Sequence, residues 1–186
     1  STLDQGGDRA EPTKENTMVG SFPEGETNHS SIGSFVVVRN DGYGGGHIVE
    51  RTTLALAHML EVLDQVVVVD LNTQPGTPIF LSLLPHSISG TSKLKSVVIS
   101  REQCTRELGS PCKDKMYELL GRNIGLREST SVYIISTNPE VFIPSRFTII
   151  EIMHRISLQP ERSAVILPRE DISATEARTR AKRLSD

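Results

Sequence analysis

The sequence predicts a three-layer α/β/α protein in which a mostly parallel sheet lies between two layers of helices. The first observation is a run of four valines at residues 66–69 that leads directly into Asp70. An uninterrupted apolar run of this kind is typical of a strand that is buried on both faces, as in a parallel sheet. The second observation is that such runs alternate with segments of helical periodicity, which favours helices on both faces of the sheet.

The first strand is expected at residues 35–38, where Phe-Val-Val-Val precedes a polar segment. A glycine-rich segment, 42–46, comes after it. From residue 48 to residue 63 the apolar positions recur at helical spacing, which predicts a long helix. Together with the strand at 66–69, these elements form one β-α-β unit.

The later elements continue the same alternation. Apolar runs and turn signals predict, in chain order, a short helix at 78–84, a strand at 96–99, a helix at 114–120, a strand at 132–135, a helix at 145–156 and a fifth strand at 164–167. Residues 101–113 are polar and contain Gly109 and Pro111, which predicts a loop or a short irregular helix. The glycine-containing segment 121–127 is expected to connect the preceding helix to the fourth strand.

The two ends of the chain differ in composition from its middle. Residues 1–31 contain few apolar side chains and cannot bury enough surface to offset the entropy of ordering, so we expect a disordered arm. Residues 32–172 contain all the predicted strands and are expected to form one domain. Residues 173–186 are charged, and we expect a tail with little to bury. The chain does not begin with Met, which indicates a processed or excised piece.

The charge balance argues against two classes of partner. The chain has 20 Lys and Arg residues against 23 Asp and Glu residues, for a net charge of −3. No basic surface therefore supports nucleic-acid binding or attraction to an anionic membrane. No apolar run approaches the ~20 residues of a membrane-spanning helix, and no signal peptide is recognised.

The two cysteines, Cys104 and Cys112, form no C-x-x-C pair and have no His nearby at ligand spacing. The pattern indicates neither a disulfide framework nor a zinc site, so we expect two incidental thiols. The lack of a signal peptide, of a membrane span and of a disulfide pattern together favours a cytoplasmic location.

Polar side chains come after three of the predicted strands, at the point where each strand ends. They are Arg39, Asn40 and Asp41 after the first strand, Asp70 and Asn72 after the second, and Asn138 and Glu140 after the fourth. In open α/β sheets the binding crevice lies outside the carboxyl ends of the strands, so we expect these side chains to converge on a ligand. The alternative is that Asp70 caps the next turn and that Asn138-Pro139-Glu140 is itself a turn.

A glycine-rich turn after the first strand and an acidic residue after the second first suggest a dinucleotide-binding site. Gly42 and Gly44 match the first two glycines of G-x-G-x-x-G, but the third position is His47. An NAD(P)-dependent oxidoreductase of Rossmann type is therefore one hypothesis for the function. A non-catalytic interaction domain is another.

A larger set of motifs between residues 35 and 172 points to a different family. These are Val-Val-Arg-Asn-Asp at 37–41, Val-Val-Asp-Leu-Asn at 68–72, Arg-Asn-Ile-Gly at 122–125 and Ile-Ile-Ser-Thr-Asn-Pro-Glu at 134–140. In this order and spacing they resemble the inverting nucleotide-sugar glycosyltransferases of the GT-A fold. The resemblance implies a nucleotide-diphosphate sugar, usually a UDP-sugar, as donor substrate.

The resemblance also implies roles for individual residues. The nucleotide side of the site is implied for Arg39, Asn40, Asp41, Asp70 and Asn72, and the helix that approaches the phosphates is implied for Arg122 and Asn123. At the family's Asp-x-Asp position, Asn138 and Glu140 are implied to hold Mn²⁺ or Mg²⁺, for which the Asn carbonyl oxygen and the carboxylate are suitable ligands.

An inverting transferase also needs a carboxylate base to accept the proton of the acceptor hydroxyl. The candidates after residue 140 are Glu151, Glu161, Glu170 and Asp171, and none lies within a recognisable motif. The chain ends soon after the predicted fifth strand. We therefore expect the donor-binding half of such an enzyme, with an acceptor half that is shortened or absent.

Overall fold

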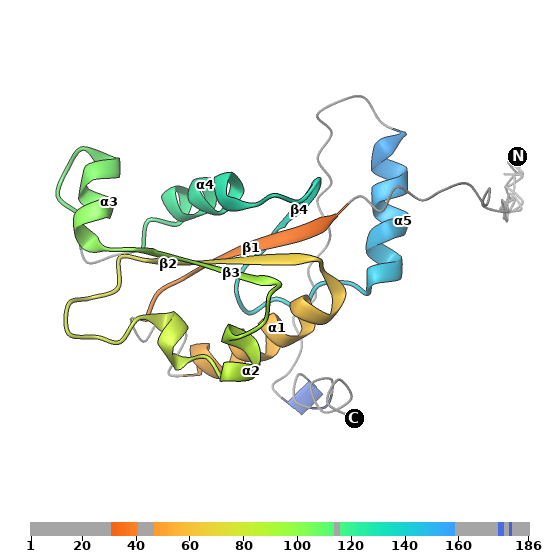
Figure 1. Ribbon diagram of the computed structural model, residues 1–186, viewed down its shortest axis with the longest axis horizontal. Coiled ribbons are helices and arrows are strands. Elements are labelled where there is room, and N and C mark those ends of the chain that lie inside the picture. The colour runs from red at the N-terminus through yellow and green to blue at the C-terminus, as the bar shows by residue number, and fades with distance from the viewer. Residues whose placement is uncertain (1–30, 41–46, 114–115, 159–174, 177–178, 180–186) are drawn as a thin grey trace, which may run out of the picture.

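The computed structural model describes residues 31–40, 47–113, 116–158, 175–176 and 179, and their fold is α/β with a parallel sheet (Figure 1). The sheet of these residues has four strands in the order β3-β2-β1-β4, and every neighbouring pair is parallel. The strands are β1 Ile32–Val38, β2 Gln65–Leu71, β3 Leu94–Ile99 and β4 Tyr133–Ser136. The predicted parallel sheet is thus confirmed, while the predicted fifth strand at 164–167 lies outside the described residues.

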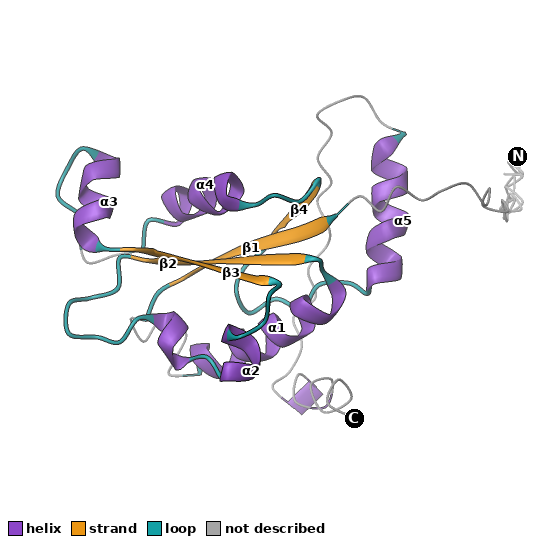
Figure 2. Cartoon of the chain, viewed as in Figure 1, coloured by secondary structure: helices purple, strands orange, loops and turns teal. Residues whose placement is uncertain are grey.

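Helices cover both faces of this sheet, as Figure 2 shows. On one face lie α1, the 3₁₀ helix η1 and α2, and on the other lies α4, with α3 beyond the end of the sheet on the same side. Their bounds are α1 Ile48–Val62, η1 Phe80–Leu83, α2 His86–Ser89, α3 Arg101–Leu108 and α4 Glu118–Glu128. The last described helix, α5 Arg146–Ser157, stands beside the sheet.

The valine run of β2 contributes to both halves of the core. Val66 and Val68 pack with α1 in one apolar cluster, while Val67 and Val69 pack with α4 in the other. All four side chains are fully buried. Because successive side chains of a strand point to opposite faces, burial on both sides explains why the run has no polar interruption.

Helix α4 differs from its prediction, which placed a helix at 114–120 and a connecting segment at 121–127. The observed helix continues to Glu128, and Gly121 and Gly125 lie inside it. A Cβ on Gly121 would overlap Cγ1 of Val37, and one on Gly125 would be 2.8 Å from the Phe35 ring. The prediction was wrong because these glycines allow the helix to lie close against β1 rather than ending it.

Residues 101–113, expected as a loop or a short irregular helix, form the short helix α3 and a loop after it. Ser100 and Gln103 form a capping box that starts α3, and Gly109 ends the helix in the left-handed conformation with φ of 63°. Cys104 and Cys112 form a disulfide that closes the segment after the helix. The expectation of two incidental thiols was therefore wrong, because the turn at Gly109 brings the chain back over α3.

The remaining domain predictions concern residues that are described only in part. Nearly all of the expected arm at 1–31 and most of the expected tail at 173–186 lie outside the described residues. Among the helices that are described, none is long and apolar enough to cross a membrane. The cytoplasmic location stays a prediction, and the disulfide removes one of its three grounds.

Candidate ligand-binding site

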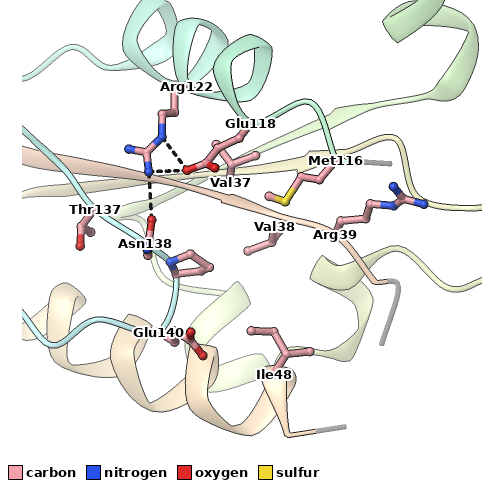
Figure 3. Close-up of a pocket in the computed structure, with 11 residues that line it drawn as sticks. Val37, Val38, Arg39, Ile48, Met116, Glu118, Arg122, Thr137, Asn138 and Glu140 are labelled. Carbon is pink, nitrogen blue, oxygen red and sulfur yellow. Dashed lines mark hydrogen bonds and ion pairs between the residues drawn. The ribbon is translucent and has the colours of Figure 1, made fainter. Parts of the chain in front are cut away.

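The sheet has a point at which successive connections run in opposite directions. From β1 the chain moves to β2 and β3 on one side, and it then returns to place β4 on the other side of β1. Ligands of open α/β sheets bind at such a switch point, outside the carboxyl ends of the strands. A cavity of about 310 Å³ lies there (Figure 3). It is lined by Val37, Val38, Arg39, Ile48, Met116, Glu118, Arg122, Thr137, Asn138, Pro139 and Glu140.

The end of β1 supplies one wall of this cavity. Arg39 comes directly after the strand, and its side chain is 4% exposed. Asn40 turns away, because its Nδ2 donates a hydrogen bond of 2.8 Å to the carbonyl oxygen of Pro78. Asp41 lies outside the described residues. Of the three polar residues predicted here, the described structure therefore places Arg39 at the cavity.

Arg122 links α4 to the end of β4. Its Nε and Nη2 donate to Oε1 of Glu118, one turn earlier in the helix, at 2.9 and 2.6 Å. Its Nη1 donates to Oγ of Ser136 at 2.5 Å, and its Nη2 donates to Oδ1 of Asn138 at 2.9 Å. The dashed lines in Figure 3 show the contacts with Glu118 and Asn138. Asn123, the next residue of the helix, is exposed and does not line the cavity.

Glu140 faces the opposite side of the cavity, toward α1 (Figure 3). Its Oε2 accepts a hydrogen bond of 2.7 Å from Nε of Arg51. Arg51 lies in the first turn of α1, whose first residue, Ile48, also lines the cavity. The positive end of the helix dipole of α1 is therefore directed to this side of the site.

Asp70 is fully buried and does not line the cavity. Its carboxylate accepts hydrogen bonds from Oγ1 of Thr73 at 2.7 Å and from the backbone N–H of Leu81 at 3.2 Å. Burial raises the pKa of the Asp70 carboxyl, and hydrogen bonds from Thr73, Leu81 and the Phe80 backbone oppose this shift only in part. The carboxylate thus holds the segment that leads from β2 into η1.

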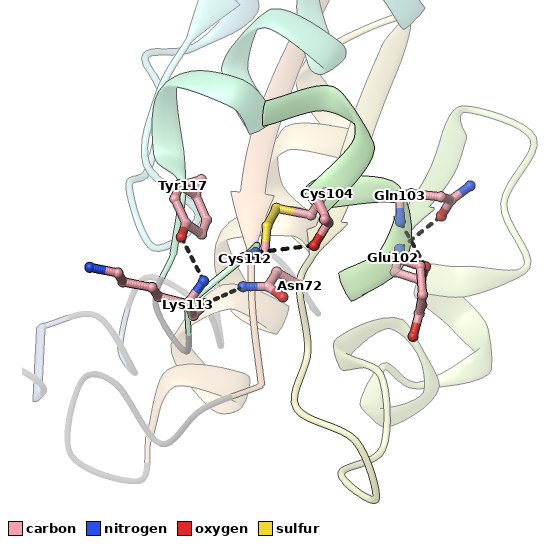
Figure 4. Close-up of a disulfide and its surroundings, with 9 residues drawn as sticks. Asn72, Glu102, Gln103, Cys104, Cys112, Lys113 and Tyr117 are labelled. Atoms are coloured by element: carbon pink, nitrogen blue, oxygen red, sulfur yellow. Dashed lines mark hydrogen bonds between the residues drawn. A yellow bond between two sulfur atoms is a disulfide. The ribbon is translucent and has the colours of Figure 1, made fainter. Parts of the chain in front are cut away.

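Asn72 is also fully buried and does not line the cavity. It has a φ of 59°, a left-handed conformation that Asn tolerates better than most residues. Its Nδ2 donates a hydrogen bond of 3.0 Å to the carbonyl oxygen of Lys113, next to the disulfide (Figure 4). The backbone N–H of Lys113 in turn donates to Oη of Tyr117 at 2.8 Å. Asn72 therefore anchors the segment that precedes α4.

The structure brings together four of the predicted site residues, namely Arg39, Arg122, Asn138 and Glu140. Sequence reasoning missed Glu118 and Ser136, which position Arg122, and Arg51, which positions Glu140. Glu118 and Arg122 are spaced i,i+4, a helical ion-pair signal that was hidden because the helix was predicted to end at residue 120. No sequence signal links Arg51 to Glu140, because 89 positions separate them.

The metal implied by the resemblance does not suit these side chains. Oδ1 of Asn138 and Oε2 of Glu140 already accept hydrogen bonds from two guanidinium groups, those of Arg122 and Arg51. Among the described residues, no group of three or more His, Cys, Asp and Glu side chains is placed to hold a metal ion. The predicted ligands therefore act in this structure as acceptors for arginine.

Comparisons of the chain with protein-family models, curated proteins and solved structures give no match. The resemblance to glycosyltransferases thus stays a prediction that rests on the motifs of the sequence alone.

Proposed function

We propose that the chain binds a nucleotide-diphosphate sugar, with UDP as the nucleotide, and acts as the donor-binding domain of a GT-A-type glycosyltransferase. The observation that carries the proposal is the cavity at the ends of β1 and β4, which is lined by Arg122, with its guanidinium group beside Asn138, and by the largely buried Arg39. A parallel sheet offers a ligand site at this point. A guanidinium group suits phosphate because it donates two parallel hydrogen bonds to its oxygens.

The chemistry of sugar transfer explains why cations belong at this position. The bond between C1 of the sugar and the phosphate oxygen breaks, and its electron pair leaves with the nucleotide diphosphate. A bond forms between C1 and the acceptor oxygen, whose proton passes to a base. Negative charge grows on the departing diphosphate, so positive groups fixed beside it lower the barrier. That Arg39 and Arg122 line the cavity supports this role for them.

The one predicted candidate for the base that lies among the described residues, Glu151, does not line the cavity. Of the four predicted candidates, Glu151 lies on α5, where its Oε1 accepts a 2.6 Å hydrogen bond from Nη2 of Arg155. Glu161, Glu170 and Asp171 lie outside the described residues. The cavity residues are therefore assigned to binding the donor and presenting its C1, and no residue is assigned to the acceptor.

The strand order also supports a second candidate, because β3-β2-β1-β4 is the order found in dinucleotide-binding folds. In those folds an acidic residue after the second strand binds a ribose hydroxyl. Here that position is Asp70, whose buried carboxylate instead accepts hydrogen bonds from Thr73 and Leu81. The burial of Asp70 counts equally against the nucleotide role that the resemblance implies for it, so this position does not separate the two candidates.

Isothermal calorimetry with UDP, UDP-glucose, ADP and NAD tests the proposal on the full chain. We expect UDP and UDP-glucose to bind more tightly than ADP and NAD, and to raise the melting temperature at saturating concentration because they bind the folded state. Tighter binding of NAD than of UDP would instead support the oxidoreductase.

Two variants on the same helix serve as a matched pair. Arg122→Ala removes a guanidinium group from the cavity and should weaken UDP binding at least about tenfold, as expected for a lost charged hydrogen bond. Arg127→Ala removes the same charge from a position outside the cavity, where its ion-pair contact with Glu107 is 4.0 Å long, and UDP binding should persist. No binding of any nucleotide by the parent chain would favour the non-catalytic interaction domain.

A further inference from the structure

We propose that the cavity takes its diphosphate ligand without a divalent metal, and that the guanidinium groups of Arg39, Arg51 and Arg122 supply the positive charge. This inference rests on the proposed function, because it concerns how the same cavity holds the phosphates. Under this inference Asn138 and Glu140 accept hydrogen bonds from arginine side chains. The resemblance implies instead that they hold Mn²⁺ or Mg²⁺.

The side-chain amide of Asn138 is oriented by Arg122. The amide has one acceptor atom, Oδ1, and this atom accepts a 2.9 Å hydrogen bond from Nη2 of Arg122. Arginine only donates, so the partner determines which way the amide is turned. A metal ion held by Asn138 would have to share this oxygen with the guanidinium group, and the two positive charges would then lie side by side.

Glu140 points away from Asn138 toward α1, as Figure 3 shows. Its Oε2 lies 2.7 Å from Nε of Arg51. A divalent cation within bonding distance of this carboxylate would lie beside a positive charge. Because the two side chains are 42% and 31% exposed, solvent only partly screens that repulsion.

The sign of the net charge at and beside the cavity suits an anionic ligand. Among the described residues that line the cavity, Arg39 and Arg122 balance Glu118 and Glu140, and Arg51, which is paired with Glu140 beside the cavity, adds one positive charge. A small positive surplus suits an anionic ligand. A metal site at the same place needs the opposite balance, because divalent hard cations select for carboxylate-rich ligand sets.

The contacts of Arg122 indicate how a phosphate would enter. Glu118 holds the guanidinium group from within α4, whereas the acceptors on the sheet side, Ser136 and Asn138, are neutral. A phosphate oxygen is a stronger acceptor than either because it is charged. We therefore expect phosphate to replace one of the neutral acceptors while Glu118 keeps the guanidinium group in position.

Calorimetry of UDP binding in EDTA, in MgCl₂ and in MnCl₂ tests the inference on the full chain. We expect the Kd of the parent to be the same in the three buffers to within about twofold. Arg122→Ala should weaken binding in EDTA at least about tenfold. Arg155→Ala removes an equivalent i,i+4 ion pair on α5, away from the cavity, and should leave the Kd unchanged.

Circular dichroism and melting curves show whether Arg122→Ala is folded. If it does not melt cooperatively, Arg122→Lys replaces it, since Lys keeps the charge and loses the parallel hydrogen bonds. We expect the Kd of the Lys variant in EDTA to be weaker than that of the parent by several fold. A Lys variant that binds as tightly as the parent would overturn the role of the guanidinium group.

The double variant Arg51→Met, Asn138→Asp tests the reason for metal independence. It removes the guanidinium group beside Glu140 and adds a second carboxylate, so Mn²⁺ should now strengthen UDP binding about tenfold or more. A double variant indifferent to Mn²⁺ would overturn the part of the inference that assigns metal exclusion to Arg51 and to the lack of a carboxylate at position 138. A parent chain that binds UDP about tenfold more tightly with Mn²⁺ would overturn it and leave the proposed function standing. A parent that binds UDP in none of the buffers would overturn both.

Discussion

The carboxyl edge of the sheet has two halves that are equally polar in sequence and differ in structure. We call the ends of β1 and β4, with Arg39, Ser136 and Asn138, the open rim. We call the end of β2, with Asp70 and Asn72, the closed rim. The open rim borders the cavity, whereas both residues of the closed rim are fully buried. Among the described residues of the two rims, Arg39 and Asn138 of the open rim line the cavity, and Asp70 and Asn72 of the closed rim do not.

The two rims differ in the course that the chain takes after each strand. After β2 the chain folds back and supplies partners for its own strand end, as Leu81 does for Asp70 and Lys113 does for Asn72. At the open rim, side chains from other elements reach the strand ends, as Arg122 does for Ser136 and Asn138. A polar residue at a strand end therefore marks a ligand site only where the next segment of the chain leaves it uncovered.

The largest effect is expected at the closed rim, from the disulfide beside Lys113. The double variant Cys104→Ser, Cys112→Ser should lower the free energy of unfolding by about 2–3 kcal/mol, because the bond restricts a short loop of the unfolded chain. The Kd for UDP should change by less than about twofold. Urea unfolding measures the first quantity and calorimetry the second.

Parent protein treated with dithiothreitol is the control for that experiment, and its unfolding midpoint should match that of the serine variant. Equal midpoints for the oxidised parent and the variant would contradict the stabilising role of the bond. A large loss of UDP affinity in the folded variant would show that the two rims are coupled.

The next largest effect is expected for Asp70→Ala. This variant distinguishes a structural role of Asp70 from a role in nucleotide binding. Asp70→Ala leaves the N–H of Leu81 without its buried acceptor and should lower the free energy of unfolding by about 2 kcal/mol. UDP binding by the folded variant should persist, since Asp70 does not line the cavity. Loss of binding in a folded variant would restore the nucleotide role implied for Asp70.

The pH dependence of stability gives a second test of the structural role of the Asp70 carboxyl. Its pKa is raised above the ordinary value of 3.8, so the folded state holds this proton more tightly than the unfolded state. The stability contributed by the carboxyl is therefore greatest at low pH and falls as the pH rises through the raised pKa. Asp70→Asn should remove this decline, because an amide can accept from Leu81 and donate to Thr73 without ionising. Unfolding curves between pH 3 and pH 7 compare the two proteins.

A smaller effect is expected at the open rim from Glu118→Gln. The carboxylate of Glu118 is 54% exposed and neutralises Arg122. Its replacement by an amide should strengthen UDP binding by about two- to fivefold, the scale of an exposed ion pair. Stability should change little. Weaker binding in this variant would indicate that Glu118 acts mainly by positioning the guanidinium group.

The smallest effect is expected at Asp64, which lies at the amino end of the sheet and belongs to neither rim. Burial raises the pKa of Asp64, but the N–H of Ile32 and the guanidinium group of Arg146 lower it more, so the net shift is downward. This carboxyl stabilises the fold above pH 3.8, and the contribution is lost as the pH falls through the lowered pKa. Because the side chain is 39% exposed, we expect Asp64→Asn to remove no more than about 1 kcal/mol at pH 7.

Acid unfolding of the Asp64→Asn variant measures this contribution. The same experiment serves as a reference for Asp70, whose contribution to stability should change with pH in the opposite direction. The parent should lose stability relative to the Asp64→Asn variant on acidification, and gain it relative to the Asp70→Asn variant. The same direction for both would contradict the difference between the two carboxyl environments.

Parts of the fold were predictable because a single physical cause acts over several neighbouring residues. The valines of β2 are buried on both faces, and this requirement alone excludes polar residues from the run. The periodicity of α1 likewise reflects one apolar face, whereas α5 buries Ile149 and leaves Phe147 and Ile150 exposed. Both helices begin within one residue of their predicted start. In contrast, Gly121 and Gly125 indicated a break in α4, because the sequence does not show that a strand lies against them.

Local patterns of residues were enough to predict the α/β class and the polar residues at the strand ends. Which of those residues meet depends on how the elements pack. The strand order places β4 beside β1, and this position brings Arg122 to Asn138 and Arg51 to Glu140. The return of the chain over β2 covers Asp70 and Asn72. These outcomes depend on contacts between segments far apart in the chain, and such contacts leave no local pattern of residues.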